Sequence, residues 1–176
     1  EPIQINSQSG KGGVSYVMEK KFGYTIPAPM LAEFSRLITE LSDAKQTVME
    51  PEEIHAAFKE HYVNLQSPLK LISYHCDLKD NVTTITASIE FNGKATDLVA
   101  EGNGPLDALC AGIRAQMQED FEIVSYSEHA LERTSSSKAV SYIALKYKDQ
   151  TYWGAGVDAN INTSSILALI SALNRI

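Results

Sequence analysis

The same pattern of strand and turn signals occurs twice in the sequence, and this internal duplication limits the folds that the chain can adopt. Residues 84–91 alternate polar and apolar side chains as a strand does, with Ile85, Ala87, Ile89 and Phe91 on one face. Asn92-Gly93, a strong hairpin signal, follows directly. Residues 139–147 alternate again, and the Lys148-Asp149-Gln150 turn comes 56 residues after the first hairpin. The chain therefore contains two related β-hairpins.

Each hairpin leads through a glycine- or asparagine-rich segment into a helical pattern. Leu106-Asp107-Ala108-Leu109 in the first lies 60 residues before Ile166-Leu167-Ala168-Leu169 in the second. One helix over a three-stranded sheet makes a poor core alone, but two such units can share one. We therefore predict a domain of residues 68–176 built from two βββα units, 68–119 and 120–176. The first helix carries an apolar stripe of Leu106, Leu109, Cys110, Ile113 and Met117.

Residues 1–65 show helical instead of strand periodicity. Apolar residues recur every three or four positions in three segments: Gly13–Phe22, a segment introduced by Pro27 and Pro29, and a segment that opens at Pro51. Gly23 stands where a helix C-cap is expected. The predicted fold class is α+β, with a small helical subdomain (1–65) followed by a duplicated βββα domain.

Composition excludes several classes of function. The 15 basic and 22 acidic residues give a net charge of −7, which argues against nucleic acid as a partner. No apolar run approaches the roughly 20 residues that span a bilayer, so no membrane partner is expected. The two cysteines show no disulfide or metal-binding spacing, which favours a reducing, cytoplasmic location. The start of the chain lacks Met and looks like an internal point of a longer protein.

The segment SQSGKGG (residues 7–13) raises the possibility of a phosphate-binding loop. A P-loop requires GxxxxGK[ST], whereas Gly12 follows Lys11 here, and Ile5 stands where the first Gly is needed. We therefore interpret the segment as a tight glycine-rich loop, although its N–H groups could face an anion at a helix start. Glu128 and His129 are neighbours on a predicted strand and point to opposite faces, so they form no acid–base pair. No catalytic or metal constellation is predicted.

Two segments that open helices are candidates for ligand binding. GNGP (residues 102–105) combines two glycines with a proline suited to a first helical turn, and free N–H groups there would suit a carboxylate. The corresponding GVDANIN (residues 156–162) carries Asp158, which could receive an ammonium group or act as a turn or capping residue. Ordinary strand-to-helix turns explain both motifs equally well. The pattern favours binding or regulation over catalysis.

Several motifs, in order, resemble a known family over nearly the whole chain. NSQSGKGGVSYVMEKKFGYTIP, MLAEFSRLI and IHAAFKEHYV resemble the linker subdomain of the long type of 2-isopropylmalate synthase. EGNGPLDAL, YSEHAL and YWGAGVDANINTSSILALISALNR resemble the C-terminal regulatory domain of the same family. The resemblance implies the duplicated βββα fold that the sequence pattern also predicts.

The resemblance also implies a function. The family condenses acetyl-CoA with 3-methyl-2-oxobutanoate, the first committed step to leucine, in a TIM barrel that carries a divalent metal. This chain would be the regulatory end of such an enzyme, without the barrel, with no cofactor or catalytic residue of its own, and inactive alone. In the family, leucine binds between two regulatory domains and inhibits the distant barrel, so we expect a homodimer with leucine as effector.

Matched motif by motif, the resemblance assigns the leucine pocket to four groups of residues. These are Gly102, Asn103, Gly104 and Leu106 at the first helix start; Ile123, Tyr126 and Ala130 in the YSEHAL strand; Ser137 and Ala139 at the start of the next strand; and Val157 and Ala159 in GVDANIN. Asp107 and Asp158 depart from the residues common in the family, and both bear on the choice of effector.

Three alternatives remain at this stage. Citramalate synthase has a related regulatory domain that binds isoleucine, and the position of one methyl group separates the two effectors, which is worth about 1–3 kcal/mol. The SQSGKGG linker favours isopropylmalate synthase. A free-standing amino-acid-binding module is the second alternative. The third, an enzyme in its own right, is disfavoured because no metal or nucleophile pattern is present.

Overall fold

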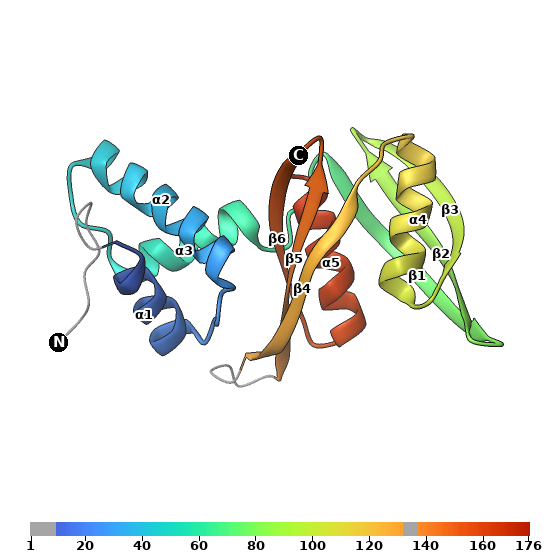
Figure 1. Cartoon of the computed structure of the whole chain (residues 1–176), viewed down its shortest axis with the longest axis horizontal. Helices are drawn as coiled ribbons and strands as arrows, with labels where there is room; N and C mark the ends of the chain where they lie inside the picture. The colour runs from blue at the N-terminus through green and yellow to red at the C-terminus, as the bar shows by residue number, and fades with distance from the viewer. Residues whose placement is uncertain (1–9, 132–136) are drawn as a thin grey trace. The chain divides into compact units, whose positions relative to one another are not determined.

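The computed structural model describes residues 10–131 and 137–176 (Figure 1). Its elements, in chain order, are α1 (Gly10–Phe22), α2 (Ala28–Lys45), α3 (Pro51–Tyr62), β1 (Leu69–Lys79), β2 (Val82–Phe91), β3 (Lys94–Gly102), α4 (Pro105–Met117), β4 (Glu122–Leu131), β5 (Lys138–Tyr147), β6 (Gln150–Asp158) and α5 (Ile161–Leu173). They fall into two compact units. The helical unit is drawn from Glu1–His61 and His129–Lys138, and the sheet unit from Tyr62–Glu128 and Ala139–Ile176.

The helical unit contains the three helices that periodicity predicts. Gly23 ends α1 with a φ of 80°, and the N–H groups of Gly23 and Tyr24 donate to the carbonyls of Glu19 and Met18. α1 begins at Gly10, three residues before the predicted start. The division of the chain into a linker subdomain (1–65) and a regulatory domain (68–176) stays a prediction about function. Residues 1–9 and 132–136 lie outside the described part, and they include residues 7–9 of the SQSGKGG segment. The rest of that segment, residues 10–13, belongs to α1, so the interpretation of these residues as a tight loop is wrong.

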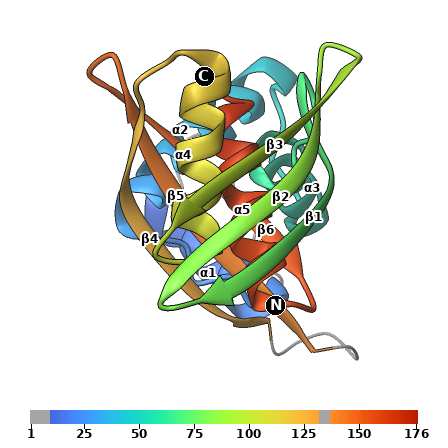
Figure 2. The ribbon, with the colours of Figure 1, turned by 90° about the vertical axis from the view of Figure 1, so that its right-hand side faces the viewer.

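The sheet unit consists of two antiparallel three-stranded sheets, β1-β2-β3 and β4-β5-β6, each followed by a helix. Figures 1 and 2 show α4 and α5 side by side between the two sheets. This arrangement confirms the α+β fold class with a duplicated βββα domain. Asn92-Gly93 and Lys148-Asp149 are two-residue turns with positive φ at both positions, as the twist of a hairpin requires. Asp80-Asn81 forms a third turn of this kind, which the sequence analysis did not identify.

The duplication is more regular than the sequence analysis indicates. α4 and α5 begin at Pro105 and Ile161, which are 56 residues apart, the same separation as the hairpins. The 60-residue spacing between LDAL and ILAL is therefore wrong as a structural equivalence, because it is one helical turn too long. Gly104 corresponds to Asn160 and Cys110 to Ile166. The two repeats can thus be compared position by position.

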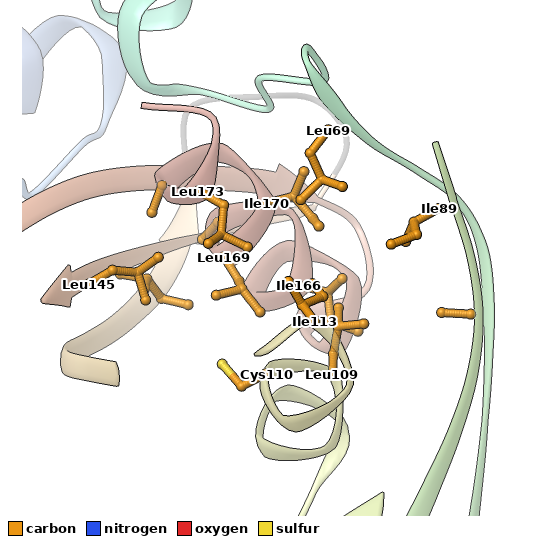
Figure 3. Close-up of a cluster of buried hydrophobic side chains, with 14 of the residues drawn as sticks. Leu69, Ile89, Leu109, Cys110, Ile113, Leu145, Ile166, Leu169, Ile170 and Leu173 are labelled. Carbon is orange, nitrogen blue, oxygen red and sulfur yellow. The ribbon is translucent and has the colours of Figure 1, made fainter. Parts of the chain in front are cut away.

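The two repeats share one hydrophobic core between α4 and α5. Leu109 and Ile113 of α4 are fully buried, as are Ile166 and Leu169 of α5, and Figure 3 shows Ile113 pointing toward Ile166. β2 contributes its predicted apolar face, of which Ile85, Ala87 and Ile89 are buried. Two residues predicted to continue these stripes do not. Phe91, beside the hairpin turn, is 45% exposed, and Met117, in the last turn of α4, is 37% exposed.

Glycines let α5 approach β6 at backbone contact. A Cβ atom at Gly156 would lie 2.0 Å from the carbonyl oxygen of Ser164, and one at Gly154 would lie 2.2 Å from the backbone nitrogen of Ala172. Neither distance is compatible with a side chain. Gly112 of α4 is different, since its Cβ would meet the end of the flexible Leu98 side chain at 2.8 Å.

We expect Gly156→Ala to lower the free energy of unfolding by about 3 kcal/mol or more, because α5 would have to move away from the sheet. Gly112→Ala is the matched control. Leu98 can move, and alanine is favoured over glycine in a helix by about 1 kcal/mol, so the net change should be small. Urea denaturation of both variants measures the difference. A Gly156→Ala variant as stable as the parent chain would contradict the close packing described here.

Candidate functional site: a cavity at the start of α4

A cavity of about 740 Å³ lies in the sheet unit where the starts of α4, β4 and α5 meet. This volume is in the range of small-molecule sites. Its wall consists of Asn103, Gly104, Pro105, Leu106, Asp107, Cys110 and Arg114 from the α4 region, Asp120, Phe121, Glu122, Ile123 and Tyr126 from the β4 region, and Asn162 and Ser165 from α5.

One face of α4 forms a continuous wall of this cavity. Leu106, Cys110 and Arg114 follow one another at four-residue intervals, which places them on one side of the helix, and Asn103 lies in the turn before it. The character of this wall changes along the helix. It is polar at the start, apolar at Leu106 and Cys110, and charged at Arg114. Such a gradient suits a ligand with a polar end and an apolar end.

The start of α4 lacks a side-chain cap. Gly104 is the N-cap residue in an extended conformation, and among residues 10–131 and 137–176 no side-chain cap hydrogen bond is present at this helix start. At the equivalent place in the second repeat, the Asn160 side chain accepts from the N–H groups of Asn162 and Thr163, at 2.9 and 3.1 Å. The first turn of α4 therefore presents backbone donors, with the positive end of the helix dipole, to the cavity.

Charged groups are arranged around the cavity entrance and its far end. The Asp107 carboxylate accepts a hydrogen bond of 2.9 Å from the backbone N–H of Asn103, which holds the GNGP turn in place. The Arg114 guanidinium donates to the Phe121 carbonyl at 3.2 Å and lies over its ring. Arg114 thus joins α4 to the segment before β4. Asp107 leaves a negative charge close to the uncapped helix start.

Tyr126 connects the cavity to buried hydroxyl groups. Its hydroxyl donates to the Glu128 carboxylate and shares hydrogen bonds with Ser141 and Ser165. Burial raises the pKa of Tyr126, the interaction with Glu128 raises it further, and the two serines lower it. Ser141 in turn bonds Ser164 at 2.9 Å inside the unit. The tyrosine is therefore a neutral hydrogen-bonding group at the cavity wall.

In the second repeat, the place equivalent to the cavity lies between α5 and β1, and these two elements pack against each other. Tyr74 of β1 bonds Thr163 in the first turn of α5 at 2.6 Å. Leu71 and Tyr74 have the same spacing as Ile123 and Tyr126 in β4, and they pack onto the core. The cavity thus marks the place where the two repeats differ.

The cavity brings together five of the residues that the family resemblance assigns to the leucine pocket: Asn103, Gly104, Leu106, Ile123 and Tyr126. Gly102 lies directly behind them, where a Cβ would meet the Asp107 carboxylate at 2.6 Å. The leucine-binding roles of all eleven residues stay predictions. Besides Gly102, five of the eleven are not among the described wall residues: Ala130, Ser137, Ala139, Val157 and Ala159.

Several wall residues escaped the sequence analysis as site residues. Cys110 and Arg114 could have been found, because they follow Leu106 at helical spacing. Asn162 and Ser165 come from the other repeat and had no such signal. Asp158, considered as an ammonium receptor or a turn residue, accepts a 2.9 Å hydrogen bond from the Asn160 N–H within its own turn and is not among the wall residues. Val157 exchanges two backbone hydrogen bonds with the Asn64 side chain.

The histidines and cysteines of the described segments show no catalytic grouping. His129 accepts a 3.2 Å hydrogen bond from the Thr25 N–H, while Glu128 binds Tyr126. No cluster of three or more His, Cys, Asp or Glu in residues 10–131 and 137–176 is placed to hold a metal ion. Within the same residues, no helix is long and apolar enough to cross a membrane.

Comparison with known proteins agrees with this fold. Residues 48–176 match the model of the family described as LeuA allosteric (dimerisation) domain. The chain belongs to this family.

Curated relatives match nearly the whole chain. It is 41% identical over 181 residues to a protein of Clostridium acetobutylicum, 40% identical to one of Desulfitobacterium hafniense and 36% identical to one of Pseudomonas syringae pv. tomato, each named 2-isopropylmalate synthase. These alignments cover 98–99% of this chain and 31–32% of each relative. The chain therefore spans about a third of the length of the relatives that it matches.

Proposed function

We propose that this chain is the regulatory end of a cytoplasmic 2-isopropylmalate synthase and that it binds leucine as a feedback inhibitor. The condensation of acetyl-CoA with 3-methyl-2-oxobutanoate would occur in a metal-bearing barrel elsewhere in the full-length protein. The chain alone would be inactive. Membership of an allosteric domain family and the names of the relatives support this proposal.

The observation that carries the proposal is the uncapped start of α4 at a cavity of suitable size. A leucine carboxylate would accept hydrogen bonds from the first-turn N–H groups, which no side chain caps. The ammonium group would lie near Asp107, and the isobutyl group would extend along Leu106 and Ile123. Each part of the amino acid then meets a wall of matching chemistry.

The first test is isothermal calorimetry of the 176-residue chain with leucine, isoleucine and valine. We expect leucine to bind more tightly than the other two, since the branch point of its side chain differs from theirs and pockets distinguish such isomers by about 1–3 kcal/mol. A preference for isoleucine would instead favour the regulatory domain of citramalate synthase. If none of the three releases or absorbs heat, the effector proposal is wrong for this chain.

A second proposal concerns the oligomeric state. Val124, Tyr126 and Ile161 are 50%, 44% and 42% exposed although they are large apolar or aromatic residues. Such residues, grouped at the starts of β4 and α5, are typical of protein interfaces. In a homodimer, residues of the second copy would complete the effector site. The family resemblance adds Ala130, Ser137, Ala139, Val157 and Ala159 to that site.

We therefore expect sedimentation velocity to show a dimer at micromolar concentration, and leucine to shift the equilibrium toward it. Val124→Lys should weaken the dimer, because an exposed charge would have to be buried against the partner. Val99→Lys is a control, since Val99 is also exposed but lies on β3. A monomer at high concentration with saturating leucine would contradict the proposed dimer.

We expect Gly104→Asp to abolish leucine binding in calorimetry. Aspartate at an N-cap accepts hydrogen bonds from the first-turn N–H groups, so it would occupy the donors meant for the leucine carboxylate and also repel it. The substitution should not harm folding, because a Cβ at Gly104 meets no atom within 4 Å.

Two further variants at this position separate the causes. Gly104→Ala adds a methyl group without an acceptor and should retain binding. Gly104→Asn introduces the neutral cap found at Asn160 in the second repeat. Loss of binding in Gly104→Asn shows competition for the donors, and loss in Gly104→Asp alone shows charge repulsion. Unchanged affinity in both would place the carboxylate elsewhere.

A further inference from the structure

We propose that Cys110 sets the length of the aliphatic side chain that the cavity accepts. This inference rests on the proposed amino-acid site and names the residue that determines its selectivity. The chemistry concerned is the contact between the wall of the cavity and the end of the effector's alkyl group.

The position of Cys110 on α4 supports this role. It lies one helical turn beyond Leu106 on the face that lines the cavity, and thus one turn farther from the uncapped helix start. An amino acid held by its carboxylate at Gly104 would extend its side chain past Leu106 toward Cys110. Figure 3 shows the Cys110 sulfur on a different side of α4 from the Leu109 side chain, and both residues belong to the buried core.

The surroundings of Cys110 suit an alkyl group. The residue is only 2% exposed, and Phe121 and Ile123 of the opposite wall are buried and half-buried apolar residues. Burial raises the pKa of the Cys110 thiol to about 11, with smaller opposing effects of Arg114 and Asp107. The thiol is therefore uncharged at neutral pH and behaves as a small apolar group.

The internal duplication supplies a comparison within the same molecule. The residue equivalent to Cys110 in the second repeat is Ile166, which is fully buried. There α5 packs against β1, and Tyr74 bonds Thr163 across that contact. A larger side chain thus accompanies the closed contact and a smaller one the cavity. In both repeats, the size of the side chain at this helix position thus matches the space beside it: the smaller side chain leaves room for a ligand and the larger one does not.

The test is calorimetry of a size series at position 110 with valine, leucine and phenylalanine. Cys110→Ile, which copies the second repeat, should weaken leucine binding about tenfold or more and affect valine less, because the added atoms occupy the space of the leucine methyl groups. Cys110→Ala should shift the preference in the opposite direction, toward phenylalanine. Cys76→Ala is the control, since Cys76 lies on β1 and is absent from the cavity wall.

Two controls guard against misfolded variants. Each variant at position 110 should keep a cooperative urea denaturation curve, and Cys110→Val, which adds little volume, should keep the preference for leucine. Leucine binding with an unchanged preference across the folded size series would overturn the inference and leave the proposed function intact. No binding of any amino acid to the parent chain would overturn both.

Discussion

The contact between α4 and α5 is the interaction on which the sheet unit depends. Each repeat offers a three-stranded sheet and one helix, and such a layer pair buries little apolar surface alone. Leu109 and Ile113 from one helix and Ile166 and Leu169 from the other close the core between the repeats. Since both helices are held in this way, their N-terminal turns are fixed with respect to the strands, and the cavity at the start of α4 has a defined shape.

The cavity arises because the two repeats are not identical at three equivalent positions. Asn160 caps α5, while Gly104 leaves α4 uncapped. Thr163 bonds Tyr74, whereas Asp107 bonds the backbone of its own turn. Ile166 is large where Cys110 is small. At each of these positions, the first repeat either lacks an interaction that the second repeat makes or carries a smaller side chain. A ligand at α4 would thus replace contacts that the protein makes for itself at α5.

Much of this architecture could be predicted from the sequence, because turn chemistry and periodicity act locally. Asn92-Gly93 turns, Gly23 ends a helix, and Ile85, Ala87 and Ile89 face the core, as their patterns indicate. The Asp80-Asn81 turn was missed because it adopts positive φ at two positions without a glycine. The contribution of Asn162 and Ser165 to the cavity was also missed. The packing of α4 against α5 decides which helix start lies beside which strand. Local sequence patterns carry no information about that packing.

Strand β4 belongs to both units, which bears on how a ligand at the cavity could influence distant parts of a larger protein. Ile123 and Tyr126 line the cavity, and three residues after Tyr126 the His129 ring accepts a hydrogen bond from the Thr25 N–H within the helical unit. Thr25 lies between α1 and α2. Coupling between sites requires an element with two arrangements whose equilibrium the ligand biases. The continuity of β4 therefore identifies the residues that such coupling would have to involve, and is not in itself evidence of coupling.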